Sequence, residues 1–318
     1  MRIVRFVPAS DANATPSVGL LRDDGVVDVS ALVADLPANT PQQQMESFID
    51  AYDSLRPQLE QALAGGPAIA LDAVRLRPPL PRPSKLLNCI GNYWEHAERE
   101  PRPLNMFLKS PDCVIGDGDT VVLPNNTSPY MFQHEAELGI VFKGPAKDVS
   151  QDDWRSVVFG YTCMIDVSAR AQGRSTWRSG SWMGKSFDTF GPLGPCITTA
   201  DEITEPNNLW VKFWNNGDLR HDYVTDDMEH RVPELVEFAT NIMTMNSGDV
   251  LSCGTNHEGL GPLQDGETGV IEIQNIGAMT IHVSDPLKRE WERGIYMGEN
   301  STNREAVRLR EQQQQAQT

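Results

Sequence analysis

Positive charge and long apolar runs are both scarce in this sequence, and each scarcity excludes a class of partner. Lysine and arginine number 27 against 44 aspartates and glutamates, which gives a formal net charge of −17. This balance disfavours nonspecific binding to nucleic acid or to anionic membranes. No segment approaches the roughly 20 apolar residues of a membrane-spanning helix, and residues 1–7 alternate like a strand rather than forming a signal peptide. We expect neither nucleic acid nor membrane as a partner, and a cytoplasmic location.

Closely spaced cysteines and nucleotide-binding turns are missing as well. The five cysteines are far apart and never form Cys-x-x-Cys (Cys89, Cys113, Cys163, Cys196 and Cys253). Zinc and dithiol redox sites need such spacing, so neither is predicted. Single cysteines beside apolar residues are typical of a reducing compartment. Residues 184–186 read Gly-Lys-Ser, but the upstream glycine of a phosphate-binding loop is absent, as is a Gly-x-Gly-x-x-Gly turn.

The length and composition predict a globular protein with a small domain in front of a large one. Of the 318 residues, 39% are hydrophobic and 22% are charged, which is ordinary for a globular chain. Residues 1–75 predict a small N-terminal α+β domain, with a turn at residues 23–25 and a helix at residues 42–64. The prolines of residues 77–83 interrupt regular structure and indicate a linker.

Residues 76–290 predict a β-rich domain, because short apolar runs alternate there with glycine, proline, asparagine and aspartate. This spacing is typical of mixed or antiparallel sheets. Two helices are expected, at residues 151–157 and 232–246, the second with Pro233 in its first turn. Residues 291–318 form a charged, glutamine-rich C-terminal tail that we expect to be partly disordered.

Three carboxylates are the most informative side chains of the sequence. Glu135 and Glu137 stand two apart in an apolar, β-branched run, so that in a strand they share a face. Asp166 lies in a second run of this kind. Buried carboxylates repel one another unless a proton or a cation relieves them, and oxygen ligands suit Mg²⁺, Mn²⁺ or Ca²⁺ better than zinc. The sequence therefore predicts a divalent metal site. The alternative, the solvated face of an edge strand, fits poorly beside the apolar residues 138–142.

Six motifs, in this order along the chain, resemble the fumarylacetoacetate hydrolase family. They are Cys89 to His96, Met106 to Pro111, Glu135-x-Glu137, Gly160 to Arg170, Gly184 to Pro195 and Gly248 to Thr255. The likeness spans about residues 85–285, and it is specific because separate motifs agree. It implies a mixed β-roll catalytic domain, α+β and β-rich, behind a small N-terminal domain. It also implies a homodimer, and a divalent metal held by Glu135, Glu137 and Asp166.

The resemblance implies a reaction class as well. Family members hydrolyse a carbon–carbon bond in acylpyruvates, isomerise 2-hydroxymuconate-like diacids or decarboxylate oxaloacetate, always through an enol or enolate beside a carboxylate. A 2-oxo acid can chelate a metal that stabilises this enolate. The leading hypothesis is a hydrolase of a small 1,3-dicarbonyl acid with Mg²⁺, Mn²⁺ or Ca²⁺ as cofactor. An isomerase or decarboxylase on the same metal site is the alternative. A non-catalytic binding protein that kept the fold is a third hypothesis.

His96 is the candidate base for activating water, because its motif carries a histidine in the family and an imidazole titrates near neutrality. Hydrolytic members place a glutamate three residues later, where this chain has Arg99. Glu98 and Glu100 flank that position, and one of them could take the role after a shift of register. Otherwise the pair is absent and the reaction is not hydrolysis. Lys185 is expected to neutralise a substrate oxygen, to act as counter-ion to the three acids, or both.

Further contacts with the substrate are expected from six residues: Tyr93, Arg170, Gln172, Thr255, Asn256 and His257. Arg170 could hold a carboxylate bidentately or brace Asp166. Gln172 falls one residue earlier than the family's glutamine, and Tyr93 has core packing as its alternative. Thr255 matches the family, but Asn256 and His257 follow it where members have proline. They indicate either a distinct substrate preference or only an altered turn.

Overall fold

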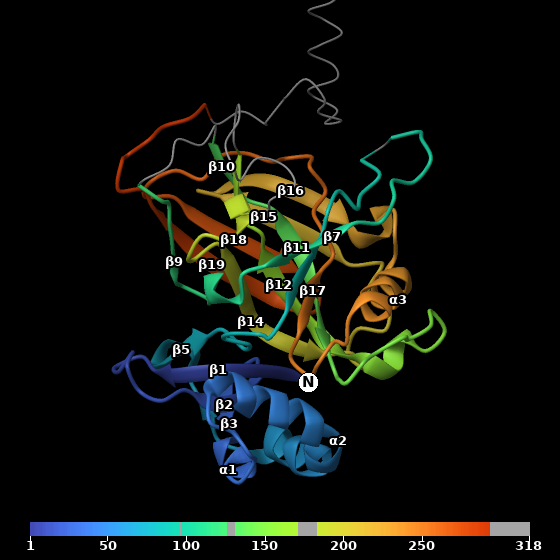
Figure 1. The fold of residues 1–318 in the computed structure, drawn as a ribbon. Coiled ribbons are helices and arrows are strands. Elements are labelled where there is room, and N and C mark those ends of the chain that lie inside the picture. The colour runs from blue at the N-terminus through green and yellow to red at the C-terminus, as the bar shows by residue number, and fades with distance from the viewer. Residues whose placement is uncertain (96, 126–130, 171–182, 293–318) are drawn as a thin grey trace, which may run out of the picture.

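In the computed structural model of the protein, the residues described are 1–95, 97–125, 131–170 and 183–292. Within these residues the strands form three sheets, and helices are few (Figure 1). The main sheet contains, in spatial order, β4 (Ala68–Ile69), β3 (Gly25–Asp28), β2 (Ser17–Arg22), β1 (Arg2–Pro8), β14 (Gly191–Thr199), β12 (Val158–Ile165), β11 (Ala136–Phe142), β17 (Val250–Ser252), β6 (Leu86–Cys89) and β7 (Met106–Lys109), with β5 (Val74–Arg77) beside β1 and β8 (Val114–Ile115) beside β14.

Two smaller sheets complete the architecture. One contains β16 (Asp218–Val224), β15 (Trp210–Asn215), β18 (Thr268–Ile273), β19 (Gly277–Ser284) and β9 (Thr120–Val122), and the other pairs β10 (Met131–Gln133) with β13 (Ser168–Arg170). Strands β15 and β18 pack against β11 and β12 of the main sheet, so the two larger sheets face each other. Most pairs are antiparallel, but β6/β17, β8/β14 and β9/β19 are parallel. The β-rich mixed fold expected from the sequence is confirmed.

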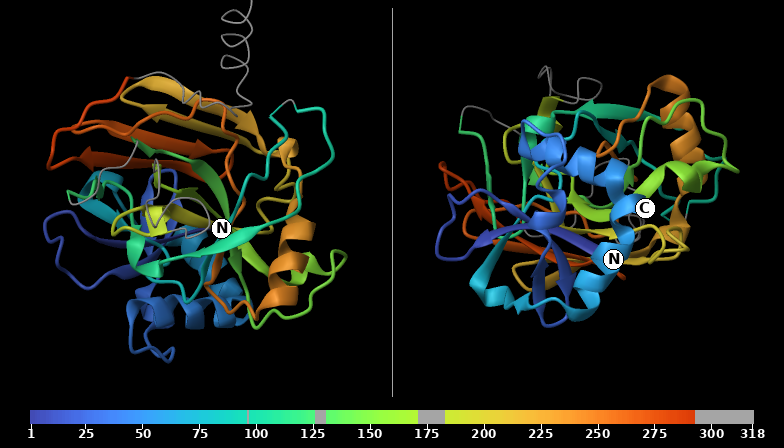
Figure 2. Two further views of the ribbon diagram at one scale, coloured as in Figure 1. Left: turned by 45° about the horizontal axis from the view of Figure 1, so that its top comes forward. Right: turned by 90° about the horizontal axis from the view of Figure 1, so that it is seen from below.

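The helices are α1 (Ser30–Val33), α2 (Pro41–Gly65) and α3 (Val232–Ile242), and the 3-10 turns are η1 (Leu71–Ala73), η2 (Pro111–Cys113), η3 (Trp154–Val157), η4 (Met183–Lys185) and η5 (Thr225–Asp227). Helix α2 begins where the Thr40 hydroxyl accepts a hydrogen bond from the amide of Gln43, with Pro41 in the first turn. Seen from below in Figure 2, α2 lies across the N-terminal strands. Among the described residues, no helix is both long and apolar enough to span a membrane.

Two of the expected helices are shorter in the structure. The segment 151–157 contains only the 3-10 turn η3, and backbone hydrogen bonds there join residues three apart, as from the Ser156 amide to the Asp153 carbonyl. Helix α3 ends at Ile242 rather than Asn246, since Met245 exchanges backbone hydrogen bonds with Ala146. The helix expected at residues 42–64 is confirmed as α2, and the turn at residues 23–25 connects β2 to β3.

The N-terminal strands continue the main sheet. Strand β1 pairs with β14 through Arg2↔Thr198 and Ile3↔Ile197, and Phe48 and Tyr52 of α2 make edge-to-face contacts with one another and with Phe159 at the start of β12. A single cluster of buried hydrophobic side chains therefore runs from α2 into the main sheet. The domain boundaries expected near residues 75 and 290 stay predictions.

Candidate metal and active site

One edge of the main sheet gathers the ends of four strands. Strands β6 and β17 run parallel and end there, with Ser252 opposite Asn88. Strand β11 is antiparallel to β17 and β12, so it begins where both of them end. Figure 1 shows β11, β12 and β17 side by side at the centre of the molecule. Residues just beyond these strand ends are brought together even though they are far apart in the sequence.

The three predicted acids lie at this edge. Glu135 directly precedes β11, Glu137 is its second residue, and Asp166 directly follows β12. The amide of Asp166 donates to the carbonyl of Glu135 at 2.8 Å, which extends the ladder between the strands by one bond. All three side chains are buried, and one carboxylate oxygen from each lies within 4.8 Å of the others. The clustering predicted from the sequence is thus present in the structure.

Three cations surround these acids. Lys185, at the end of η4, donates to Glu135 Oε2 and to Asp166 Oδ2, both at 2.7 Å. Lys109, at the end of β7, is buried and donates to Asp166 Oδ1 at 2.7 Å. Arg170 donates to Glu135 through Nη2 and to Gln133 through Nε. Arg170 therefore braces Glu135. The sequence had suggested that it could brace Asp166 instead, and the structure corrects this.

The protonation of the two glutamates differs because their neighbours differ. Burial alone would raise the pKa of Glu135, but the charges of Lys185 and Arg170 outweigh burial and lower it. Burial, and then the charges of Asp166 and Glu135, raise the pKa of Glu137 well above its ordinary value. Burial opposes the charge of Lys185, yet Asp166 and Glu135 raise the pKa of its ammonium group. Without a further cation, Glu137 therefore keeps its proton to a higher pH than Glu135 does.

The donors at this cluster fit a hard divalent cation. Glu137 Oε2 accepts hydrogen bonds from the Ser252 hydroxyl and from the amide of Gly254, whereas its Oε1 atom is buried without a hydrogen-bond partner among the described residues. A buried oxygen of this kind is costly unless something binds it. Glu135, Glu137 and Asp166 offer oxygen atoms only, which is the ligand set that Mg²⁺, Mn²⁺ and Ca²⁺ prefer.

The segment after β17 carries three of the predicted substrate contacts. Thr255 and Asn256 are buried, and the Asn256 amide donates to Asp227 Oδ2 at 3.0 Å. His257 Nδ1 lies 2.5 Å from Glu95 Oε1, and the backbone amide of His257 donates to the same oxygen at 2.8 Å. A histidine–carboxylate pair is therefore present, but it differs from the His96 pair considered from the sequence.

Arg99 stands where hydrolytic members are expected to carry a glutamate, and it is itself paired with a glutamate of another segment. Its guanidinium contacts Glu229, just before α3, and Arg102 donates to the same carboxylate from Nε at 2.7 Å and from its amide at 2.6 Å. Glu98 and Glu100 are exposed on either side. The Arg99 position thus holds the loop to the segment before α3, and the structure places Glu98 and Glu100 on the surface.

The remaining predicted residues fall into two groups. Tyr93 is fully buried, and its ring packs edge-on against Tyr223 with centroids 5.0 Å apart, the arrangement of a packing residue beneath the site. His96 and Gln172 lie outside the described residues, so their roles stay predictions.

Three residues of the site region escaped sequence reasoning. Lys109 lies in a motif that was identified only through its resemblance to the family. A lysine at the end of an apolar strand is a weak signal that its side chain is buried. Glu95 immediately precedes His96, but its partner His257 is 162 residues away. Glu229 is likewise joined to Arg99 across 130 residues. Each of these pairs joins segments that are far apart in the sequence, so only the folded structure reveals it.

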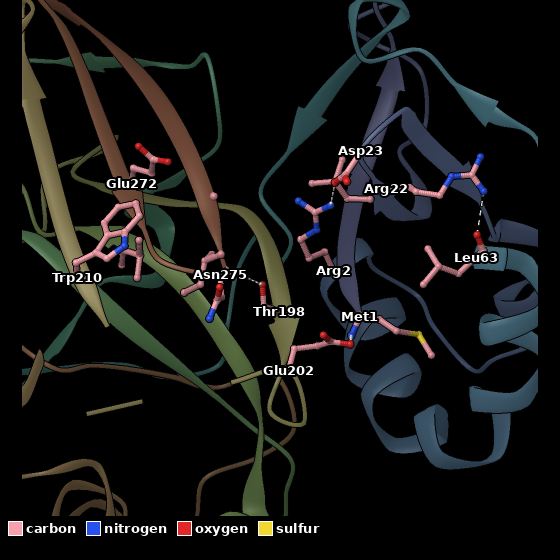
Figure 3. Close-up of a pocket in the computed structure, with 14 residues that line it drawn as sticks. Met1, Arg2, Arg22, Asp23, Leu63, Thr198, Glu202, Trp210, Glu272 and Asn275 are labelled. Carbon is pink, nitrogen blue, oxygen red and sulfur yellow. Dashed lines mark hydrogen bonds and ion pairs between the residues drawn. The ribbon is translucent and has the colours of Figure 1, made fainter. Parts of the chain in front are cut away.

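A hollow lies between the N-terminal strands and the five-stranded sheet, away from the acids (Figure 3). It measures about 660 Å³, and Arg2 and Arg22 on one wall face Trp210 and Glu272 on the other. Arg2 is paired with Asp23 at 2.8 Å. None of the predicted site residues lines this hollow, so we assign the chemistry to the acid cluster.

Comparison with known protein families agrees with the site. Residues 87–284 match the family described as Fumarylacetoacetate (FAA) hydrolase C-terminal. This stretch covers more than half of the chain and contains Glu135, Glu137, Asp166 and Lys185.

Relatives and solved structures also match along most of the chain. A maleylpyruvate hydrolase of Aquipseudomonas alcaligenes is 31% identical over 84% of this chain and 96% of its own length. The crystal structure of a maleylpyruvate hydrolase from Sphingobium sp. SYK-6, in complex with manganese(II) and pyruvate, has a TM-score of 0.78 at 34% identity and covers 90% of this chain and 99% of its own. A 5-carboxymethyl-2-hydroxymuconate delta-isomerase from Mycobacterium smegmatis has a TM-score of 0.69 at 30% identity, over 90% and 99% of the two chains.

Proposed function

Because this chain belongs to the fumarylacetoacetate hydrolase family, we propose that it is a divalent-metal-dependent enzyme that hydrolyses a carbon–carbon bond in a small, acylpyruvate-like 1,3-dicarbonyl acid. The observation that carries the proposal is the buried cluster of Glu135, Glu137 and Asp166 with cations on its flanks. The similar maleylpyruvate hydrolase that binds manganese(II) and pyruvate supports both the metal and the 2-oxo acid.

The charges of the site favour an anionic substrate. The three acids are matched by Lys109, Arg170 and Lys185, each in contact with at least one of them. A bound divalent cation would therefore leave a positive excess in a buried region, which an anion must compensate. A 2-oxo acid with a second carbonyl or carboxylate meets this requirement.

The chain's own residues have distinct parts in this proposal. Glu135, Glu137 and Asp166 would hold Mg²⁺ or Mn²⁺, which when bound supplies a Lewis acid for the 2-oxo group and the developing enolate. Lys185 would donate to a substrate oxygen, since its ammonium lies between two of the acids. Arg170 keeps Glu135 in place. Thr255 and Asn256 are proposed to contact the substrate from the segment after β17.

A second function is favoured by one observation. Arg99 stands where hydrolytic members are expected to carry a glutamate, and it is bound to Glu229. An isomerase or decarboxylase of 2-oxo or 2-hydroxymuconate-type diacids does not need that glutamate, and the delta-isomerase with a similar structure fits this reading. Assays of acylpyruvates, oxaloacetate and hydroxymuconate-type diacids, side by side, distinguish the two functions by which substrate is consumed and which product forms.

The decisive test removes one metal ligand. In Asp166→Asn we expect the affinity for Mg²⁺ or Mn²⁺ and the hydrolysis rate to fall by roughly 100-fold or more, because even the residues behind metal ligands contribute about 10–100-fold. Asp152→Asn is the matched control, since Asp152 is exposed and remote from the acids. Full hydrolysis by Asp166→Asn, or by the wild type in excess chelator, would refute the metal-dependent mechanism.

Other expectations follow from the same proposal. The partner is a small acid, with neither nucleic acid nor membrane involved. All five cysteines are buried free thiols, which supports a cytoplasmic location. The homodimer implied by the family stays a prediction, which light scattering of the purified protein measures.

A further inference from the structure

The pair formed by His257 and Glu95 has the geometry of a positioned base. Glu95 Oε1 accepts hydrogen bonds from both the ring and the backbone amide of His257, at 2.5 and 2.8 Å. The Glu95 side chain is buried, with 3% of it exposed, whereas 34% of the His257 side chain is exposed. One ring nitrogen is thus fixed by a buried carboxylate, and the ring itself reaches solvent-accessible space.

The fold places this pair beside the acid cluster. The segments that leave the parallel strands β6 and β17 stay together, because the side-chain amide of Asn92 donates to the carbonyl of Cys253 at 3.0 Å. One residue later, the amide of Gly254 donates to Glu137 at 3.1 Å. His257 follows three residues after Gly254. Burial raises the pKa of Glu135, and the charges of Lys185, Arg170 and then His257 lower it.

The backbone at Glu95 shows that its orientation is enforced. Glu95 has a φ of +53°, a left-handed conformation that costs a residue with a side chain about 1–2 kcal/mol. Asp227 Oδ2 holds it there by accepting hydrogen bonds from the Glu95 amide at 3.2 Å and from the Asn256 side chain at 3.0 Å. Strain of this kind persists where the surroundings over-determine a conformation, and it is concentrated at functional sites.

The second ring nitrogen of His257 has no partner among the described residues. A contrasting pair lies nearby in the sequence: His230 Nδ1 contacts Glu234 at 3.0 Å, but its Nε2 is already bound to the carbonyl of Arg102 at 2.7 Å. Both nitrogens of His230 are therefore engaged. In His257, Nε2 remains available to accept a proton while Nδ1 is held by a carboxylate, which is the arrangement that a general base requires.

We infer that His257 is the catalytic base of this enzyme and that Glu95 is its positioning residue, an inference that rests on the proposed carbon–carbon bond hydrolysis. Water gives a proton to Nε2 of His257, and the resulting hydroxide forms a bond to the carbonyl carbon remote from the 2-oxo acid. The carbon–carbon bond then breaks, and its electron pair passes into the enolate of the 2-oxo acid. The imidazolium returns its proton to the enolate carbon, so the products are a carboxylic acid and the free 2-oxo acid.

The test separates the two nitrogens of the ring. In His257→Asn the shorter amide takes the place of Nδ1 and keeps a contact with Glu95, while nothing replaces Nε2. With an acylpyruvate and Mg²⁺, we expect kcat to fall by about 10²–10⁴-fold, the usual contribution of a general base, and KM to change less than about three-fold. His257→Gln, whose amide reaches further but cannot accept the proton, is the second variant and is expected to show the same loss.

Two further experiments distinguish a catalytic role of His257 from a structural one. They are rescue by imidazole and a comparison with the second histidine–carboxylate pair. In His257→Ala, added imidazole is expected to restore hydrolysis in a saturable manner. Glu95→Gln is expected to lower kcat at least ten-fold with little change in KM, because the ring then lacks an anionic partner. His230→Gln, the control from the other histidine–carboxylate pair, is expected to hydrolyse at close to the wild-type rate. Thermal unfolding with and without Mg²⁺ shows whether each variant folds and binds the metal.

The outcomes are distinguishable. Wild-type rates in both His257→Asn and His257→Gln overturn the inference alone and leave the proposed hydrolysis standing, with His96→Ala as the next variant. A loss in His257→Ala that imidazole does not restore, accompanied by loss of Mg²⁺ binding, overturns it too, because the ring would then only support the fold. If the wild type consumes no dicarbonyl acid, the proposed function fails and this inference falls with it.

Discussion

Glu137→Gln should stabilise the protein without metal and destabilise it with metal. Glu137 is fully buried, and burial, Asp166 and Glu135 raise the pKa of its carboxyl group well above the ordinary value of 4.5. A neutral amide of the same shape can accept the hydrogen bonds from Ser252 and Gly254 and turn its NH₂ group toward the other two acids. The variant therefore stays neutral at every pH, whereas the wild type without a cation must either keep a proton on Glu137 or carry a poorly compensated buried charge.

The sign follows from linkage. A carboxyl group whose pKa is raised on folding contributes stability that is fully present below about pH 4.5 and is lost as pH rises through its folded pKa. Between pH 4.5 and the pKa of Glu137 in the folded protein, the unfolding free energy of the metal-free wild type falls by about 1.4 kcal/mol for each pH unit relative to that of the variant. Metal reverses the order, because a cation at 100 times its Kd stabilises the wild type by about 2.7 kcal/mol and the variant lacks one ligand. Metal uptake by the wild type should also release a proton, so its affinity should rise with pH.

Denaturant unfolding of both proteins at pH 6 and pH 8, in chelator and in saturating Mg²⁺ or Mn²⁺, measures the effect. We expect the variant to be more stable in chelator at pH 8 by roughly 1–5 kcal/mol, since the loss of about 1.4 kcal/mol per pH unit applies over at most the interval from pH 4.5 to pH 8. In metal we expect it to be less stable than the wild type. A variant that is less stable in chelator, or that gains as much from metal as the wild type, would show that Glu137 is not the protonated acid of a metal site.

Three further predictions concern residues around the site. For Glu229, burial raises the pKa of the carboxyl group, but hydrogen bonds from its two arginine partners lower this pKa to about 2. The stability that the group contributes is therefore present above pH 4.5 and lost as pH falls toward 2. Glu229→Gln should lower the unfolding free energy by about 1–2 kcal/mol at pH 7, a value reduced for partial solvent screening, and by much less at pH 3. Lys109→Met should cost about 3–5 kcal/mol, because it breaks a fully buried ion pair, and a loss below about 1 kcal/mol in urea unfolding would contradict the pairing. Gly259→Ala should unfold the protein or destabilise it severely, since the new Cβ would lie 1.6 Å from the Arg220 carbonyl oxygen. Gly217→Ala has a similar φ of +87° but open space around the new Cβ, so it should cost only about 1–2 kcal/mol of stability. Equal thermal midpoints for the two variants would rule out the steric argument.

The acids of the site could be predicted from the sequence because their signal is local. Glu135 and Glu137 stand two apart in a run whose other members are apolar, and a strand places such residues on one face. Their burial then follows from the run itself, and burial of several carboxylates calls for a cation. Helix α2 was predictable for a similar reason, since 25 consecutive residues carry its pattern and Thr40 marks its start.

The pairs around the acids could not be predicted, because each depends on which strands are neighbours. Glu95 meets His257 only because β6 and β17 run parallel and end at the same edge. The sequence leaves the strand order open, since a parallel pair needs a crossover connection of about a dozen residues or more, and that connection can contain many other strands. Helix lengths failed for a related reason: the residues after Ile242 prefer a β-bridge with Ala146 to another helical turn.

The arginine at position 99 and the histidine at position 257 are related through the carboxylates of the loop between β6 and β7. Arg99 and Arg102 commit the loop to Glu229, and this leaves no carboxylate at the place where hydrolytic relatives are expected to supply one. Glu95 provides a carboxylate from the same loop, but its left-handed backbone directs the side chain toward the segment after β17 rather than along the loop. A histidine on that segment can therefore be oriented by an acid of the loop. Glu95 and His257 together supply the carboxylate and the histidine that water activation needs, so an arginine at position 99 is compatible with hydrolysis.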